Sequence, residues 1–259
     1  MDSVISDNRY GLWHKDVPSA FVCHQLAPLP PFGGKAAHWL SYKLHRRFLR
    51  QFDHIWIPDF PGENNLSGKL SHYFGQNDPR LKWPGPLSRF AGFENKPVEK
   101  KWAVVALLSG PEPQRSMLER ALSQQLSGMN KKGLIIQGKP DSSPFFEEKS
   151  GYTLCNYLSG EALAATLLAA DAVIARPGYS SLMDFAALGL KQLVLVPTPG
   201  QTEQEYLARR LSAEGRVWTE KQRDLSLARG LKEVKACTGL ALEGESEYRE
   251  LLEVFLRGA

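Results

Sequence analysis

Residues 170–208 read ADAVIARPGYSSLMDFAALGLKQLVLVPTPGQTEQEYLA, and this stretch decides the fold class. The apolar run 172–175 predicts a strand, which leads into the turn RPGYSS and then a helix. A second apolar run, 193–196, leads into the polar loop PTPGQTEQE and another helix. Strands that alternate with helices predict a parallel sheet with right-handed crossovers. The stretch therefore indicates an α/β protein with an open sheet.

The turn RPGYSS has the composition of an anion site. We expect Gly178 to adopt a backbone conformation closed to other residues, and Ser180 and Ser181 to cap the helix that follows. Free amides at the start of a helix suit an anion. Because ligands of open α/β sheets bind outside the carboxyl ends of the strands, this turn and the polar loop after residue 196 point to one ligand. A phosphorylated, polyhydroxylated molecule such as a nucleotide sugar fits both.

Composition narrows the class of protein. The chain has 259 residues, of which 42% are apolar and 23% charged, as is typical of soluble globular proteins. It has no apolar run long enough to span a bilayer and no signal peptide, so we expect a cytoplasmic location. The three cysteines, Cys23, Cys155 and Cys237, predict neither disulfides nor a metal site. A net charge of +4 is compatible with an anionic ligand or a membrane surface and excludes a nucleic-acid partner.

Two domains are predicted, residues 1–95 and residues 96–259, with a linker in the stretch 84–97. The first has expected strands at 4–6, 17–23 and 54–57; in the second, strands and helices alternate regularly from residue 101 onward. A final helix is expected over 245–257 and can pack back on the first domain. Because residues 4–6 already form a strand, we expect the first part of the amino-terminal domain to be missing.

A basic amphipathic helix is predicted over residues 36–52. Apolar side chains recur at helical spacing at Trp39, Leu40, Leu44 and Phe48, and lysine and arginine side chains lie between them. Two interpretations stay open. The helix is either a surface helix with a solvated basic face or a contact for a membrane or a lipid phosphate.

Three loops at the carboxyl ends of the expected strands carry candidate ligand groups. After the strand that begins at Trp102, Ser109, the Gly110 amide and Arg115 could hold a phosphate, although the segment is not a Walker loop and could be only a tight turn. Asp184 lies about one helical turn after Ser180, so its carboxylate could accept hydrogen bonds from ribose hydroxyls. It could instead make only a helix-dipole contact.

Other polar residues suggest the remainder of a site. Gln201, Thr202, Glu203 and Gln204 could bond sugar hydroxyls, although a capping box of Thr202 with Glu205 is also compatible with the sequence. His24 follows a strand beside Gln25 and is either a structural histidine or a catalytic base. The remaining histidines show no pairing that suggests a metal.

From Trp102 to Leu211 the sequence resembles the MurG-like family 28 glycosyltransferases, which have the GT-B fold of two Rossmann-like domains and transfer N-acetylglucosamine. The resemblance rests on the strand that ends at Ser109 and Gly110, on RPGYSSLMDFAALGL and on PTPGQTEQEY. The segments VPSAFVCHQL and GPLSRF resemble the family's acceptor-domain loop and interdomain linker. The family's glycine-rich amino-terminal loop has no counterpart here, so the acceptor domain is expected to be incomplete.

The resemblance implies a role for each matching position. On the donor side, Asp184 would bind the ribose hydroxyls, and Gln204 and Glu205 would contact the donor sugar. The backbone of Asn156, Tyr157 and Leu158 would meet the uracil ring. Gly178, Ser180 and Ser181 would face the diphosphate, and Arg89 could approach a phosphate. The acceptor side comprises Asn8, Arg9, His24 and Gln25. Glu205 stands where the family has a second glutamine, and Pro177 and Tyr179 alter the turn, which leaves the donor sugar open.

The predicted function is transfer of a hexose or N-acetylhexosamine from a UDP-sugar to an acceptor hydroxyl. We expect the donor on the second domain, the acceptor in the cleft between the domains, no cofactor, and His24 as base. A lipid-linked acceptor would place the protein at the inner face of the membrane. Two alternatives stay open: a UDP-sugar epimerase, and a nucleotide-sugar binding half-enzyme that is inactive without a partner.

Overall fold

The computed structural model describes residues 2–32, 34–73, 76–93, 98–129, 132–140, 143–242, 244 and 246–257. It contains two compact units. The amino-terminal unit comprises Met1–Leu87 together with Leu242–Ala259, and the carboxyl-terminal unit comprises Ser88–Ala241. The division after Leu87 lies earlier in the chain than the predicted boundary between residues 95 and 96. Residues 94–97 of the expected linker lie outside the described residues.

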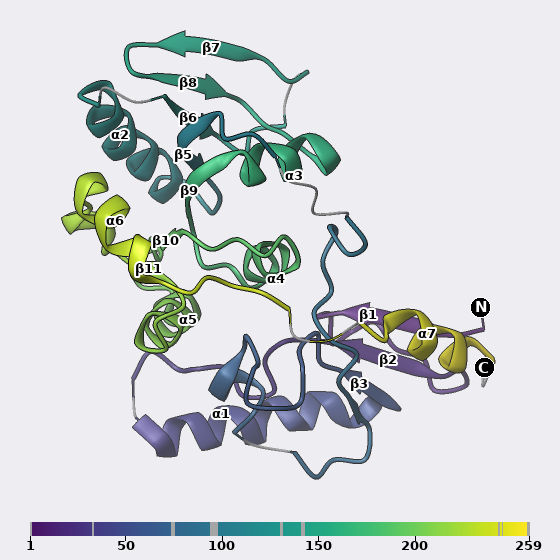
Figure 1. Ribbon diagram of the computed structural model, residues 1–259. Helices are drawn as coiled ribbons and strands as arrows, with labels where there is room; N and C mark the ends of the chain where they lie inside the picture. Colours follow the sequence, from purple (N-terminus) through teal and green to yellow (C-terminus); the bar gives the residue numbers. More distant parts are fainter. Residues whose placement is uncertain are drawn as a thin grey trace. The chain divides into compact units, whose positions relative to one another are not determined.

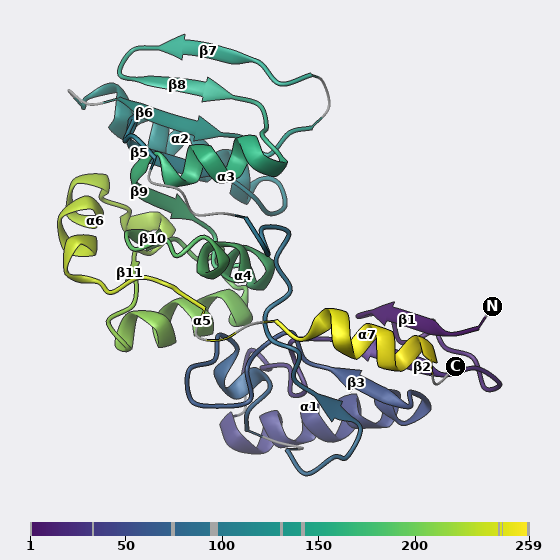
Figure 2. The same ribbon diagram turned by 45° about the vertical axis from the view of Figure 1, so that its right-hand side comes forward.

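The amino-terminal unit is built on a parallel four-stranded sheet in the order β1-β2-β3-β4 (Figure 1). One face of the sheet packs on the turn after α1, with Phe21, Phe52 and Ile55 at the centre. On α1 itself, the ring of His45 lies 6.4 Å from that of Phe21. The other face packs on α7 through Trp56 and Phe255. Helices thus cover both faces of this sheet (Figure 2). Its elements are β1 (Val4–Asp7), β2 (Ser19–Val22), α1 (Gly34–Phe48), η1 (Leu49–Gln51), β3 (His54–Trp56), η2 (Gly68–Leu70), β4 (Leu81–Lys82) and α7 (Tyr248–Arg257).

Helix α1 is held by its histidines and not by its largest apolar residues. His38 and His45 are buried, and their ring nitrogens lie 2.9 Å from the Ala27 carbonyl and 3.0 Å from the Leu26 carbonyl. Burial lowers the pKa of His45, which favours the neutral ring. In contrast, Trp39, Leu40, Leu44 and Phe48 are each about half exposed. The sequence predicted the helix, but it did not predict that the histidines face the core while the large apolar side chains are exposed.

The carboxyl-terminal unit is built on a seven-stranded sheet in the order β11-β10-β9-β5-β6-β8-β7 (Figure 1). Six strands are parallel and β7 is antiparallel to β8. Strands β6, β8 and β7 therefore lie on one side of β5 in the sheet, and β9, β10 and β11 lie on the other side. Its elements are β5 (Trp102–Leu107), α2 (Gln114–Ser127), β6 (Gly133–Ile136), β7 (Phe146–Lys149), β8 (Tyr152–Cys155), α3 (Gly160–Leu168), β9 (Ala170–Ala175), α4 (Tyr179–Ala187), β10 (Leu193–Leu195), α5 (Thr202–Ala213), β11 (Trp218–Thr219), η3 (Gln222–Asp224), α6 (Leu227–Glu233) and η4 (Val234–Ala236).

Alternating apolar residues produce the core of this unit. Val104, Ala106 and Ile174 point from the sheet to Leu118 and Leu122 on α2, and all of them are fully or almost fully buried. The α/β class and the parallel sheets predicted from the sequence are confirmed. The short strands β4, β7 and β11 were not predicted, because a run of two to four residues carries too little periodicity.

The predictions for the two helix starts are wrong in detail. The residue before α4 is Gly178, whose φ of −68° and ψ of 139° are open to any residue. Ser180 and Ser181 lie inside the first turn of α4, and neither side chain caps it. The cap of α5 is Gln201, also without a side-chain cap bond, so Thr202 does not begin a capping box. In both cases the chain enters the helix one or two residues earlier than the hydroxyl side chains suggest.

Candidate functional site

The carboxyl ends of β5 and β9 define the candidate site. These two strands pair along their whole length, and the strand order of the sheet reverses between them, because the strands that follow β5 and those that follow β9 are added on opposite sides. Ligands of open α/β sheets bind at such a switch point. Ser109 and Gly110 follow β5 and are exposed, and Gly110 has a φ of 97° that favours glycine. A Cβ at Gly110 would lie 3.8 Å from the Thr198 hydroxyl, so the loops after β5 and β10 also approach each other.

Asp184 on α4 is the most constrained acidic residue of this site. It is only 6% exposed, and each carboxylate oxygen accepts one hydrogen bond. The Ser88 hydroxyl donates to one oxygen at 2.7 Å, and Nε of Arg89 donates to the other at 2.8 Å. Both donors come from the first residues of the unit, so Asp184 fixes that segment to α4. The Arg89 side chain is itself 54% exposed.

Gln204 and Glu205 support the loop after β10. The Thr198 amide donates to Oε1 of Gln204 at 2.9 Å, and the Gly200 amide donates to Oε1 of Glu205 at 3.0 Å. Two adjacent side chains on the first turn of α5 therefore satisfy two backbone amides of the loop. Gln201 and Glu203 lie on the same helix start and are partly exposed.

Arg115 has two carboxylate partners. Its guanidinium forms an ion pair with Glu112 and another with Glu119, the latter at 3.0 Å. It also donates to the Gln137 carbonyl at 3.3 Å. A phosphate would have to compete with both carboxylates. The sequence carried a signal for these partners, because Glu112 and Glu119 lie three residues before and four residues after Arg115, spacings at which helix side chains meet.

Asn156, Tyr157 and Leu158 form the loop after β8. The Asn156 side chain is buried and joins this loop to the segment before β7: it accepts from the Phe145 amide at 2.9 Å and donates to the Ser143 carbonyl at 3.2 Å. Tyr157 and Leu158 remain partly exposed at the carboxyl edge of the sheet. Strands β5 and β6 separate this loop from β9.

Arg176 is a residue that the sequence reasoning missed. Its guanidinium is 1% exposed and donates to the carbonyls of Val196, Pro197 and Gln114 at 2.8, 2.9 and 3.0 Å. It also bonds the Gln222 side chain. Burial lowers its pKa to about 10. Arg176 thus ties together the loops after β9 and β10 and the start of α2; the only sequence signal was an arginine directly after an apolar strand.

The expected acceptor-side residues lie on two adjacent strand ends of the amino-terminal unit. Asn8 follows β1 with a φ of 53°, and its amide donates to the Val22 carbonyl at 3.0 Å. The Ser6 hydroxyl donates to the Arg9 carbonyl at 2.6 Å. His24 and Gln25 follow β2, and their side-chain nitrogens Nε2 lie 3.2 Å apart. The structure thus brings Asn8, Arg9, His24 and Gln25 to one edge of the sheet.

Among the residues that the structure describes, no group of three or more His, Cys, Asp or Glu side chains could hold a metal ion. None of the helices in this part of the chain is long and apolar enough to cross a membrane.

Comparison with solved structures defines the class of fold. The glycotransferase of kitacinnamycin superposes with a TM-score of 0.57 at 13% identity, covering 98% of this chain and 76% of that one. UGT2 of Phytolacca americana, solved with UDP-2-fluoroglucose and pterostilbene, gives 0.52 at 16% identity, with 100% and 69% covered. MurG of Acinetobacter baumannii gives 0.49 at 13% identity, with 93% and 67% covered, too low a score to favour MurG over other transferases. The chain has the GT-B fold of glycosyltransferases.

Sequence comparison gives a match to one family model. Residues 116–244 are similar to the glycosyltransferase family 28 C-terminal domain. The comparison with curated protein sequences gives no match. Together, the family and the fold support sugar transfer as the general activity of the protein.

Proposed function

We propose that the protein transfers a hexose or N-acetylhexosamine from a UDP-sugar to an acceptor hydroxyl. The observation that carries the proposal is the buried carboxylate of Asp184, which lies beside a switch point in the part of the chain that is similar to the family 28 domain. A carboxylate oxygen has room for two hydrogen bonds, so Asp184 can accept from ribose hydroxyls in addition to its two protein donors. The UDP-2-fluoroglucose complex of UGT2 supports a UDP-linked donor by analogy of fold.

The remaining donor contacts follow from the same placement. The backbone of residues 156–158 would meet the uracil, and Gln204 and Glu205 the sugar. Amides at the start of α4 and the exposed guanidinium of Arg89 would stabilise the charge that grows on the departing diphosphate. His24, at the carboxyl end of β2, is the proposed base that takes the proton from the acceptor hydroxyl.

Calorimetric titration with UDP tests the role of Asp184. We expect Asp184→Asn to weaken UDP binding by about tenfold or more, because a hydrogen bond to a charged group contributes roughly 1.5–3 kcal/mol. The matched control is Asp171→Asn, an exposed acid at the start of β9 in the same unit. Equal affinity of wild type and Asp184→Asn would remove Asp184 from the site. Release of UDP in the presence and absence of an acceptor then separates a transferase from a module that only binds.

We also propose that the protein contacts an anionic membrane surface through α1, where it would meet a lipid-linked acceptor at the inner face of the membrane. The apolar residues Leu40, Leu44 and Phe48 are exposed at i, i+4 and i+8, so they form one stripe along the helix. Lys43 Nζ lies 5.1 Å from the ring centre of the exposed Trp39. An exposed apolar stripe with flanking cations is typical of helices that lie in a membrane interface.

A further inference from the structure

A cavity of about 690 Å³ in the carboxyl-terminal unit lies between α5 and the loop after β11. Pro197, Pro199 and Ala208 give it an apolar floor. The volume is within the range of sites for small organic ligands, about 300–1,000 Å³. Glu205 is common to this cavity and the proposed donor site, whereas the switch-point loop after β5 and Asp184 do not line it.

The walls of the cavity carry three cationic side chains, Arg209, Lys221 and Arg223. Arg209 and Lys221 make no hydrogen bond or ion pair through their side chains with any residue that the structure describes. Arg223 pairs with Asp224 at 3.0 Å, but both side chains are largely exposed, so water screens that pair. The cations are therefore available to a ligand.

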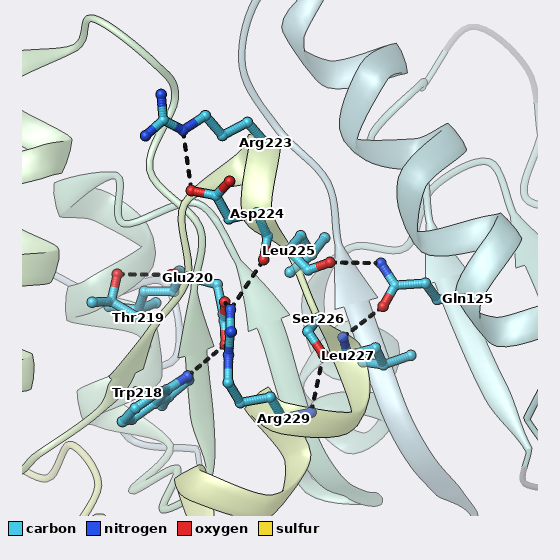
Figure 3. A network of polar contacts seen from close by, with 11 residues as sticks. Gln125, Trp218, Thr219, Glu220, Arg223, Asp224, Leu225, Ser226, Leu227 and Arg229 are labelled. Atoms are coloured by element: carbon cyan, nitrogen blue, oxygen red, sulfur yellow. Dashed lines mark hydrogen bonds and ion pairs between the residues drawn. The ribbon is translucent and has the colours of Figure 1, made fainter.

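The acidic residue closest in sequence to these cations is already compensated. Glu220 is 3% exposed and accepts from Nε1 of Trp218 at 2.9 Å and from Nε of Arg229 at 2.8 Å (Figure 3). Burial raises the pKa of Glu220, but these donors outweigh it and the net shift is downward, so the group stays ionised with its own counter-ion. Gln125 fixes the adjoining segment by bonding the Leu225 carbonyl and the Leu227 amide. Glu205, the other carboxylate that lines the cavity, accepts from the Gly200 amide at 3.0 Å. Among the described residues, neither carboxylate forms an ion pair with Arg209 or Lys221.

A fourth positive charge lies directly behind the wall. The buried guanidinium of Arg176 has no carboxylate partner among the described residues, and its Nε has no hydrogen-bond partner there. It donates to the Pro197 carbonyl and to the Gln222 side chain, and both of these residues line the cavity. A buried charge without a counter-ion is costly, and an anion in the cavity would offset that cost.

We propose that this cavity binds a ligand with a phosphate or diphosphate group and an apolar or ring-shaped portion, at a site separate from that of the donor nucleotide. A phosphate group supplies nearly two negative charges at neutral pH and several acceptor oxygens for arginine and lysine donors. The floor of proline and alanine accommodates the apolar portion. The proposal goes beyond the glycosyltransferase function and does not depend on it.

The test uses inorganic pyrophosphate and inorganic phosphate as probes, titrated by calorimetry at low salt into the 259-residue chain. The double variant Arg209→Ala/Lys221→Ala is compared with Lys232→Ala/Lys235→Ala, which removes the same charge from exposed positions on α6 and η4. We expect pyrophosphate affinity to fall by about tenfold or more in the first variant and to stay within about twofold in the second. Melting temperatures of both variants verify that they are folded.

A UDP titration of the same proteins distinguishes this site from the donor site. We expect the Arg209→Ala/Lys221→Ala variant to bind UDP as the wild type does. An equal loss of UDP and pyrophosphate affinity would mean that the cavity is part of the donor site, which overturns the inference. Wild-type protein that binds neither pyrophosphate nor phosphate overturns it as well. If the wild-type protein binds pyrophosphate but not UDP, the proposed transferase function is contradicted. The loss of pyrophosphate affinity in the Arg209→Ala/Lys221→Ala variant then still tests the cavity.

Discussion

The buried carboxylate of Asp184 contacts the guanidinium of Arg89 on one side of the candidate site. It accepts a hydrogen bond from Nε of Arg89, which leaves the terminal nitrogens of that guanidinium without a partner among the described residues. An arginine that is held at Nε and half exposed at its tip is oriented but free to bind an anion. Asp184 therefore positions Arg89, in addition to its proposed contact with ribose.

This geometry predicts a difference between two ligands. We expect Arg89→Ala to weaken UDP binding by about tenfold and to leave uridine binding within about twofold, because the guanidinium acts on the diphosphate. Calorimetry with both ligands checks it, and Arg120→Ala, an exposed arginine on α2, is the matched control. If uridine and UDP lose affinity equally, Arg89 acts only through Asp184 and not on phosphate.

At the residue scale, the sequence predicted positions better than contacts. Asp184, Gln204 and the loop after β8 could be placed at the carboxyl edge of the sheet because each follows an apolar run. That Ser88 holds Asp184 could not be predicted, because a contact between residues so far apart in the sequence depends on tertiary packing. Arg176 was missed for a related reason: its four acceptors come from three segments far apart in the sequence, namely the loop after β10, the start of α2 and the start of η3.

Among the elements, α1 departs most from ordinary amphipathic packing. Two histidines face the core and bond the carbonyls of the loop after β2, while the large apolar residues face outward. Periodicity alone cannot distinguish these arrangements, because both place apolar residues on one side of the helix. Only burial in the folded unit decides which side faces the core.

The exposed stripe of α1 predicts binding to lipid vesicles. We expect Leu44→Gln to reduce sedimentation with phosphatidylglycerol vesicles several-fold, because burial of a leucine side chain contributes roughly 1.5–3 kcal/mol. Val254→Gln, which changes a 65% exposed apolar residue on α7, is the matched control. Equal losses in both variants, or no binding of wild type to these vesicles, would contradict a specific role for α1.

For the whole molecule, the structure gives two units with separate cores. Phe52 belongs to the core of the amino-terminal unit and Leu118 to that of the carboxyl-terminal unit. The alternation of strands and helices after residue 101 allowed the strands and helices of the second unit up to α5 to be predicted, apart from β7, whereas β11 and α6 were not predicted. The first was harder, since much of the chain between β3 and β4 is irregular and its structure depends on single contacts, such as the four hydrogen bonds that Asp59 accepts from Leu66 and Ser67.

Separate cores predict two unfolding transitions. In differential scanning calorimetry, we expect Phe52→Ala to lower the midpoint temperature of one transition and Leu118→Ala that of the other. Each substitution leaves a cavity among buried side chains, which reduces the free energy of unfolding of its unit by about 2–5 kcal/mol. The control is the transition that each variant leaves unchanged. A single transition that both substitutions lower would show that the two units unfold together.

The position of α7 also sets the order in which a nascent chain can fold. Phe255 packs edge-on against Trp56 at 5.2 Å between ring centres, so a helix that follows the carboxyl-terminal unit in the sequence covers a sheet that precedes that unit. All of the carboxyl-terminal unit leaves the ribosome before α7 does, and it can fold while the sheet of the first unit still has one uncovered apolar face. Co-translational folding usually proceeds from the amino-terminal domain. Here the second unit can fold before α7 is available to cover Ala20, Val22 and Trp56 in the first.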